Sequence, residues 1–121
     1  MVIVETYLDK SPINGIGLFA KKPISKGTII WQWNGLIDKV FDRTRYNYLE
    51  SKAKEFVDKY GYVERGRIVL CGDDGRFMNH SKTPNTYETE DFTIALHDIS
   101  IGMEITCDYS TFDESFVEFN T

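Results

Sequence analysis

Short runs of β-branched and aromatic residues recur along most of the chain, and Gly, Asn, Asp and Pro separate them. Such runs favour strands, and their separators favour turns. The pattern therefore predicts a mainly β fold with short helices. Strands are expected over 2–8, 28–33, 36–41, 67–71, 92–97 and 105–109, with 36–41 pairing with 28–33 across Asn34-Gly35.

One pattern, Ile-Ser-x-Gly-x-x-Ile, occurs at 24–30 and again at 99–105. In both copies the glycine stands where a tight turn would lead the chain into a new strand. We interpret the two copies as similar corners of one β-rich fold and not as a repeat protein.

A single helix is predicted over 42–60. Asp42 can cap its start and Gly61 can end it. The apolar positions recur at steps of three and four, and so share one face: Tyr46, Leu49, Ala53, Phe56, Val57 and Tyr60.

The last residues, 110–121, form an acidic tail with aromatic side chains at steps of four and three: Phe112, Phe116 and Phe119. This spacing places them on one side of a short helix. Two interpretations stay open: the tail covers a bound ligand, or it fixes itself to the core.

Length and composition indicate one globular domain, because the chain has 121 residues of which 41% are hydrophobic and 27% charged. The N-terminal apolar run ends at Glu5, and no stretch of about 18 apolar residues follows. We therefore expect no signal peptide and no membrane span. The expected location is cytoplasmic or nuclear.

The formal net charge of −5 argues against direct nucleic-acid binding, which needs clustered Lys and Arg. It suits a basic partner, although many proteins are acidic only for solubility. Cys71 and Cys107 lie far apart without a CxxC pattern, and His80 and His97 are too few and too separated to indicate a metal site. We expect two reduced, buried thiols and no metal.

The segment 76–85, Arg-Phe-Met-Asn-His-Ser-Lys-Thr-Pro-Asn, concentrates hydrogen-bonding side chains after an apolar pair. A buried polar group without a partner costs roughly 1–3 kcal/mol, so these groups are expected to meet each other or a ligand. A plain loop is the open alternative, because Asn, Ser and Pro form turns. A second candidate is Gly15-Ile16-Gly17, ahead of a further strand, where the glycines either form a turn or let the backbone approach a ligand closely.

These two segments stand in a fixed order with a third, Gly-Met-Glu-Ile-Thr-Cys-Asp-Tyr at 102–109. Together the three resemble the SET-domain protein lysine methyltransferases, over roughly residues 2–109 and at the size of small viral or bacterial members. The resemblance implies small sheets and a knot-like C-terminal segment threaded past the Asn-His motif. It also implies one SET domain over 1–121, with 42–60 as a helical insert and 110–121 as the aromatic tail.

The resemblance further implies that S-adenosylmethionine, which becomes S-adenosylhomocysteine, is bound by Gly15, Ile16, Gly17, Tyr48, Asn79 and His80. Tyr109 matches the catalytic tyrosine of the family. Cys107 stands where many members carry an aromatic side chain that limits the number of methyl groups added. A small side chain there leaves room for di- or trimethyl-lysine, unless Cys107 only fills the core.

Two departures from the family agree with each other. Many members place a cysteine after Asn-His-Ser and three more in a zinc-binding tail, whereas this chain has Lys82 and a tail without cysteine. Neither a pre-SET module nor a zinc-binding post-SET module is therefore expected. Another cover is then needed for the cofactor and the lysine channel, and the candidates are Phe112, Phe116 and Phe119.

The implied chemistry is an in-line attack by a lysine amine on the sulfonium methyl. Lysine, with a pKa of about 10.4, must first lose its proton, and a narrow apolar channel lowers that pKa. Tyr109 is expected to orient the amine and the methyl, because an unperturbed tyrosine pKa of about 10 keeps it protonated at neutral pH.

Two functions from different classes remain. The first is a methyltransferase acting on a basic protein such as a histone tail, in a host nucleus if the chain is viral or comes from an intracellular bacterium. The second is a catalytically silent SET-like module that binds a partner protein. Retention of Gly17, Asn79, His80 and Tyr109 favours the enzyme. In either case a homodimer could complete the substrate groove.

Overall fold

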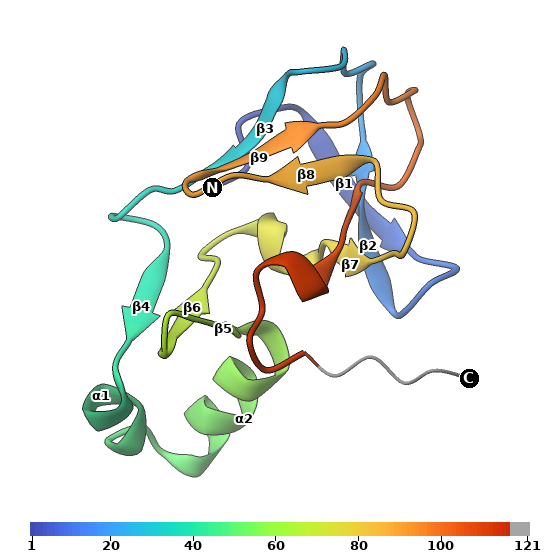
Figure 1. The fold of residues 1–121 in the computed structure, drawn as a ribbon. Coiled ribbons are helices and arrows are strands. Elements are labelled where there is room, and N and C mark those ends of the chain that lie inside the picture. Colours follow the sequence, from blue (N-terminus) through green and yellow to red (C-terminus); the bar gives the residue numbers. More distant parts are fainter. Residues whose placement is uncertain (117–121) are drawn as a thin grey trace.

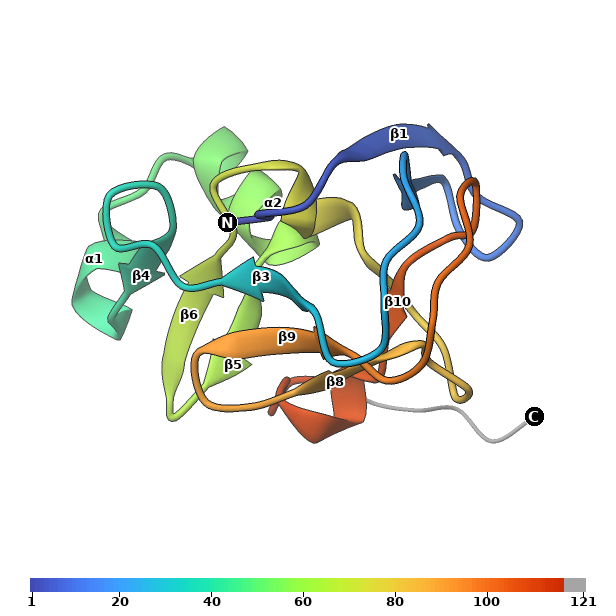
Figure 2. The ribbon, with the colours of Figure 1, turned by 90° about the horizontal axis from the view of Figure 1, so that it is seen from above.

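The structure, a computed structural model, describes residues 1–116. Within these residues the backbone forms four small sheets and two α-helices, so the predicted mainly β class is confirmed (Figures 1 and 2). The elements are β1 Thr6–Lys10, β2 Ile16–Ala20, β3 Ile29–Gln32, β4 Lys39–Phe41, α1 Arg43–Asn47, α2 Ser51–Tyr60, β5 Tyr62–Glu64, β6 Arg67–Leu70, the 3₁₀ helix η1 Asp74–Phe77, β7 Asn79–His80, β8 Thr86–Glu88, β9 Phe92–Ala95, β10 Thr106–Cys107 and the 3₁₀ helix η2 Tyr109–Thr111. Neither α-helix in this part of the chain has the length and apolar content needed to cross a bilayer.

The N-terminal residues divide between two sheets. β1 pairs antiparallel with β2, but Val2 bridges Trp31 of β3. A bend at Val4 separates the two pairings. The single strand expected over 2–8 is therefore wrong in its first half, because the backbone groups of the first residues bond to β3.

The segment after β3 does not return along β3 as expected. β3 pairs with β9, whereas β4 pairs with β6. The carboxylate of Asp38, 2% exposed, accepts backbone N–H groups of Asn34 and Gly72, each at 3.0 Å. A buried carboxylate needs such donors, so Asp38 ties this turn to the segment that follows β6. The predicted pairing of 36–41 with 28–33 is wrong for this reason.

The two copies of the Ile-Ser-x-Gly-x-x-Ile pattern lie side by side. Ile24 and Ile99 form an antiparallel bridge, with N–H to O distances of 2.9 and 2.8 Å in the two directions. Gly27 and Gly102 both have left-handed backbone angles, with φ of +85° and +81°. Both predicted corners are confirmed, because glycine takes this conformation without a steric penalty. Their mutual pairing was not predicted.

The helix predicted over 42–60 is two helices. Asp42 caps α1 as expected, since its carboxylate accepts the N–H of Arg45 at 2.8 Å. Glu50 then adopts an extended conformation, with φ −67° and ψ 161°, which interrupts the i to i−4 hydrogen bonds. The apolar spacing continues across this break, but Val57 is the one buried residue of the two helices, so the predicted single helix is wrong and its apolar face is only partly buried.

The core joins residues from all along the chain. Its members are apolar and at most 8% exposed: Leu18, Ala20, Ile24, Ile30, Met78, Ala95, Ile99, Ile105 and Cys107. Val2, Val4, Tyr109 and Phe112 pack around them. Met78 belongs to the motif at 76–85 and Cys107 to the motif at 102–109, so the core and these motifs are built from the same segments.

Asn85 attaches the segment before β10 to the loop after β7. Its Oδ1 accepts the N–H of Thr106 at 2.9 Å, and its Nδ2 donates to the carbonyl of Glu104 at 2.8 Å. Asn85 is only 9% exposed, so water cannot readily replace these bonds. The side chain takes the place of a neighbouring strand and lets β10 pair in parallel with β7.

Replacing Asn85 by alanine should lower the free energy of unfolding by about 2–4 kcal/mol, because it leaves a buried N–H and a buried carbonyl unpaired. Urea denaturation followed by circular dichroism measures this loss. Thr83→Ala, at an exposed position of the same loop, is the matched control and should change stability by less than about 0.5 kcal/mol. Equal stability of the two variants would contradict the role given to Asn85.

Candidate active site

Two of the sequence motifs meet in the parallel pair of β7 and β10. The register places Thr106 opposite Asn79 and Cys107 opposite His80. Parallel strands need a long connection, so this contact is invisible to local sequence patterns. It brings Asn79, His80, Cys107 and Tyr109 together.

Asn79 joins the glycine turn to this pair. Its Nδ2 donates to the carbonyls of Asn14 at 3.0 Å and Ile16 at 3.3 Å, and to Oε2 of Glu104 at 2.9 Å. Asn79 is 7% exposed, so its amide is fixed by these contacts. The turn that contains Gly15, Ile16 and Gly17 therefore lies beside Asn79.

Glu104 is a site residue that the sequence analysis missed. Its carboxylate accepts from Ser11 Oγ at 2.8 and 2.9 Å as well as from Asn79. A Cβ atom at position 17 would collide with its Oε2, so Gly17 is required for Glu104 to reach Asn79. The signal was a lone acidic residue inside an otherwise apolar strand-like run.

His80 presents one unsatisfied nitrogen. Its Nδ1 accepts the backbone N–H of Tyr109 at 3.0 Å, which fixes the ring. Its Nε2 is buried and has no hydrogen-bond partner among the residues described. The ring of Phe116 lies 4.6 Å from the imidazole, centre to centre. Since buried polar atoms are normally paired, Nε2 indicates a place for a polar group of a ligand.

Tyr109 lies between this region and a cavity. Its hydroxyl donates to the carbonyl of Met78 at 2.5 Å. Its ring packs against the imidazole of His80, with 5.3 Å between the ring centres. Burial raises the pKa of Tyr109, so the hydroxyl stays protonated at neutral pH. Because its proton is directed to Met78, the hydroxyl oxygen keeps its lone pairs for another group.

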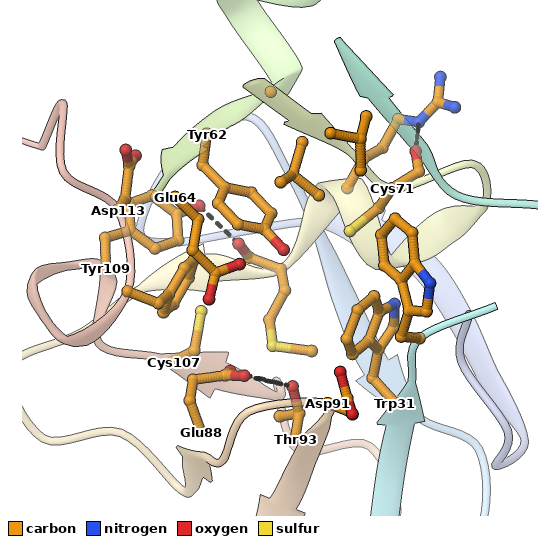
Figure 3. A pocket seen from close by; sticks show the side chains of 18 of the residues that line it. Trp31, Tyr62, Glu64, Cys71, Glu88, Asp91, Thr93, Cys107, Tyr109 and Asp113 are labelled. Carbon is orange, nitrogen blue, oxygen red and sulfur yellow. Dashed lines mark hydrogen bonds between the residues drawn. The ribbon is translucent and has the colours of Figure 1, made fainter. Parts of the chain in front are cut away.

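The cavity has a volume of about 350 Å³ (Figure 3). Tyr109, Cys107 and Phe112 line one side of it, and residues of β8 and β9 line another. Phe112 also packs edge to face on Tyr109, with ring centres 5.9 Å apart. Of the three tail aromatics, Phe112 thus faces the cavity and Phe116 faces His80, while Phe119 lies outside the described residues. Residues 112–116 form no part of the short helix expected for the tail, and the 3₁₀ helix η2 before them ends at Thr111.

Both cysteines are free, as predicted, but only Cys107 is buried and Cys71 is partly exposed. Cys107 is 3% exposed, and burial raises its pKa well above the usual value. Burial likewise raises the pKa of Cys71 to about 12. Neither is a thiolate at neutral pH, so neither is a nucleophile. In residues 1–116, no three His, Cys, Asp or Glu side chains are grouped to hold a metal.

Glu88 is a second residue that the sequence did not single out. It lies on β8, a strand too short to be predicted, and it faces the cavity beside Cys107 (Figure 3). Both carboxylate oxygens accept from Thr93 Oγ1, at 2.9 and 2.8 Å. Burial raises the pKa of Glu88 to about 7, against the lowering effect of the Thr93 hydrogen bond.

Tyr48 lies away from Asn79, His80 and Tyr109. It follows α1 and is 86% exposed. In both views the corner between α1 and α2 lies at the opposite end of the molecule from β1 and β2 (Figures 1 and 2). The structure therefore assembles the other sequence-predicted residues and leaves Tyr48 apart.

Known proteins have similar sequences. The chain is 31% identical over 113 residues to human histone-lysine N-methyltransferase 2D, covering 85% of this chain and 2% of that protein. It is 34% identical over 115 residues to mouse histone-lysine N-methyltransferase NSD3, covering 84% of this chain and 8% of that protein. The chain thus spans a small part of the length of both relatives.

The fold is also that of solved structures. One of them is a humanized mutant of the Chaetomium thermophilum Polycomb Repressive Complex 2 bound to the inhibitor GSK126. The match covers 93% of this chain and 16% of the chain in that structure, with a TM-score of 0.68 and 20% sequence identity. The family model described as the SET domain matches residues 15–110, which contain all three sequence motifs. The chain belongs to the SET-domain family.

Proposed function

We propose that the chain is an S-adenosylmethionine-dependent protein-lysine N-methyltransferase. The observation that carries the proposal is the position of Tyr109, whose ring contacts His80 while its hydroxyl, bonded to Met78, borders the cavity. A cofactor beside His80 and a lysine in the cavity would meet at this hydroxyl. The histone-lysine methyltransferase names of the relatives support the same reaction class.

The residues present fit the cofactor. The unpaired, buried Nε2 of His80 offers a hydrogen-bonding position, and Phe116 offers an aromatic surface beside it. The turn at Gly15–Gly17, fixed by Asn79, offers backbone groups at its rim. When bound, the cofactor supplies an electrophilic methyl group on a sulfonium. Residues 15–17, Asn79 and His80 would hold it.

The cavity would receive the substrate lysine. An amine is nucleophilic only after it loses its proton, and burial among Cys107, Phe112 and Tyr109 disfavours the ammonium form. The free lone pairs of the Tyr109 hydroxyl can then accept an N–H of the amine and orient its lone pair. Orientation at contact distance contributes further to the rate.

The proposed substrate is a basic protein, such as a histone tail, in the nucleus or cytoplasm. Among the described residues, five acidic side chains line the cavity against four basic ones, and one pair of these, Arg65 and Glu90, forms a salt bridge. The net charge of −5 also favours association with a basic substrate. We propose a homodimer as the form that could complete a peptide groove.

Purified protein should bind S-adenosylmethionine and S-adenosylhomocysteine saturably in calorimetric titration. Asn79→Ala should weaken binding at least about tenfold, because it releases the turn at 14–16. Asn47→Ala, at the exposed end of α1, is the matched control and should bind as wild type does. Absence of binding by folded wild-type protein would favour the silent interaction module instead.

Tyr109→Phe should lower kcat for methylation of mixed core histones by about 10²–10³-fold while cofactor affinity stays within about twofold. The substitution removes only the hydroxyl, and the ring contacts with His80 and Phe112 remain. A radiolabelled methyl assay measures the rate. Tyr87→Phe, half-exposed on β8, is the control. If the Tyr109→Phe variant is as active as wild type, the orienting role is excluded.

Wild-type protein should produce di- or trimethyl-lysine, and Cys107→Tyr should stop at monomethyl-lysine. The reason is volume, because the Cys107 side chain lines the cavity and a tyrosine ring would occupy part of it. Mass spectrometry of peptide products gives the methylation state. Cys107→Ala keeps a small side chain and should retain the wild-type products. If wild type and Cys107→Tyr both stop at monomethyl-lysine, the hypothesis fails.

A further inference from the structure

The carboxylate of Glu88 lies in the cavity that also receives the hydroxyl of Tyr109. Both residues line it, Glu88 from β8 and Tyr109 from the segment that follows β10 (Figure 3). The single hydroxyl of Thr93, within hydrogen-bond distance of both carboxylate oxygens, holds the carboxylate at this wall. Glu88 is thus an ionisable group with a fixed orientation at the place proposed for the lysine.

In the described part of the chain, no positively charged group contributes to the shifted pKa of Glu88. Glu64 on β5 adds negative potential, and Asp91, before β9, lines the same cavity. Cys107 on β10 is a neutral, buried thiol. Four cations of the described residues line the cavity: Arg65 is bonded to Glu90, Arg76 lies over the ring of Phe56, Lys59 lies over the ring of Tyr60, and Arg67 stands on β6. Within residues 1–116, no cation forms a salt bridge with Glu88, so an incoming ammonium would be its first positive partner.

We infer that Glu88 accepts the proton of the substrate ammonium and so generates the nucleophilic amine. The inference rests on the proposed lysine methyltransferase function. In this step an N–H bond of the ammonium breaks and an O–H bond forms on the carboxylate, while the electron pair of the broken bond stays on nitrogen. The cavity-bound pair changes from two ions to two neutral groups. Glu88 is partly exposed and returns the proton to solvent before the next turnover.

Desolvation lowers the free-energy cost of this transfer. A low-dielectric cavity raises the pKa of a carboxyl group and lowers that of an ammonium, so the two values approach each other. The pKa of Glu88 is already raised to about 7, mainly by burial. A base with a pKa near the working pH is the most effective proton acceptor. Tyr109 cannot take this role, because its hydroxyl is protonated and bonded to Met78.

A second role for Glu88 would be purely structural, as a hydrogen-bond partner for Thr93. The pH dependence of activity separates the two. As a proton acceptor, Glu88 must be ionised in the free enzyme, so kcat/KM should fall as pH drops through about 7. A structural carboxylate gives no such dependence.

The experiment measures kcat/KM for methylation of mixed core histones between pH 5.5 and 9 in wild type and four variants. Glu88→Gln should lower kcat/KM at pH 8 by about 10²-fold. In this variant kcat/KM should no longer fall as pH drops through about 7; this fall is the acidic limb of the wild-type profile. Thr93→Val removes a hydrogen bond that favours the ion, so the limb should move to higher pH. Glu64→Gln removes a repelling charge, so the limb should move to lower pH. Glu55→Gln, exposed on α2, is the control for charge and should keep the wild-type profile.

Thermal melting tests Glu88 without the cofactor. The folded-state pKa lies above the ordinary value of 4.5, so ionisation disfavours the folded state and wild type loses stability as pH rises from about 4.5 to about 7. Glu88→Gln cannot ionise, so its melting temperature should exceed that of wild type by several degrees more at pH 8 than at pH 5. An equal difference at both pH values would overturn the inference.

The outcomes distinguish the two levels of the proposal. If wild type methylates and Glu88→Gln keeps its rate and its limb, the role of Glu88 fails while the methyltransferase function stands. If folded wild type transfers no methyl group although the melting difference is found, the proposed function fails and the proton-acceptor role falls with it. Loss of the limb in Glu88→Gln together with opposite shifts in the Thr93 and Glu64 variants would support the inference.

Discussion

The site depends on the parallel contact between β7 and β10, two strands of two residues each. Such a short ladder has few hydrogen bonds of its own, and the amide of Asn85 adds contacts to the carbonyl of Glu104 and the N–H of Thr106. Without this attachment the Asn79-His80 segment and Tyr109 would belong to separate parts of the chain. The buried side chain of Asn85 therefore supplies hydrogen bonds that additional strands would supply in a larger sheet.

The same contact divides the site into two regions. On one side, Asn79 and Glu104 fix the glycine turn, and His80 keeps a buried nitrogen unpaired. On the other, Cys107 and Phe112 border a cavity. The Tyr109 ring and hydroxyl contact both regions. A group transfer between two separately bound molecules requires this geometry, because the reacting atoms must meet while water is excluded from each side.

Burial sets the chemical character of the titratable groups in the cavity. It holds Tyr109 and Cys107 in their neutral forms and places the pKa of Glu88 at about 7. Of these three groups, Glu88 is the one whose charge changes near physiological pH. Burial in the cavity raises this pKa, and the hydrogen bond from Thr93 on β9 partly opposes the increase.

The sequence by itself determined the mainly β class, the glycine corners at Gly27 and Gly102, the cap at Asp42 and the motif residues, because each follows from local backbone preference or a fixed residue pattern. Only the tertiary structure decided which segments pair, and so it redirected β4 to β6, divided the helical insert, brought Glu104 to Asn79 and left Tyr48 apart. It also placed Glu88 in the cavity. Strand pairing and the desolvation of a carboxylate are properties of residues distant in the chain, and no local pattern contains them.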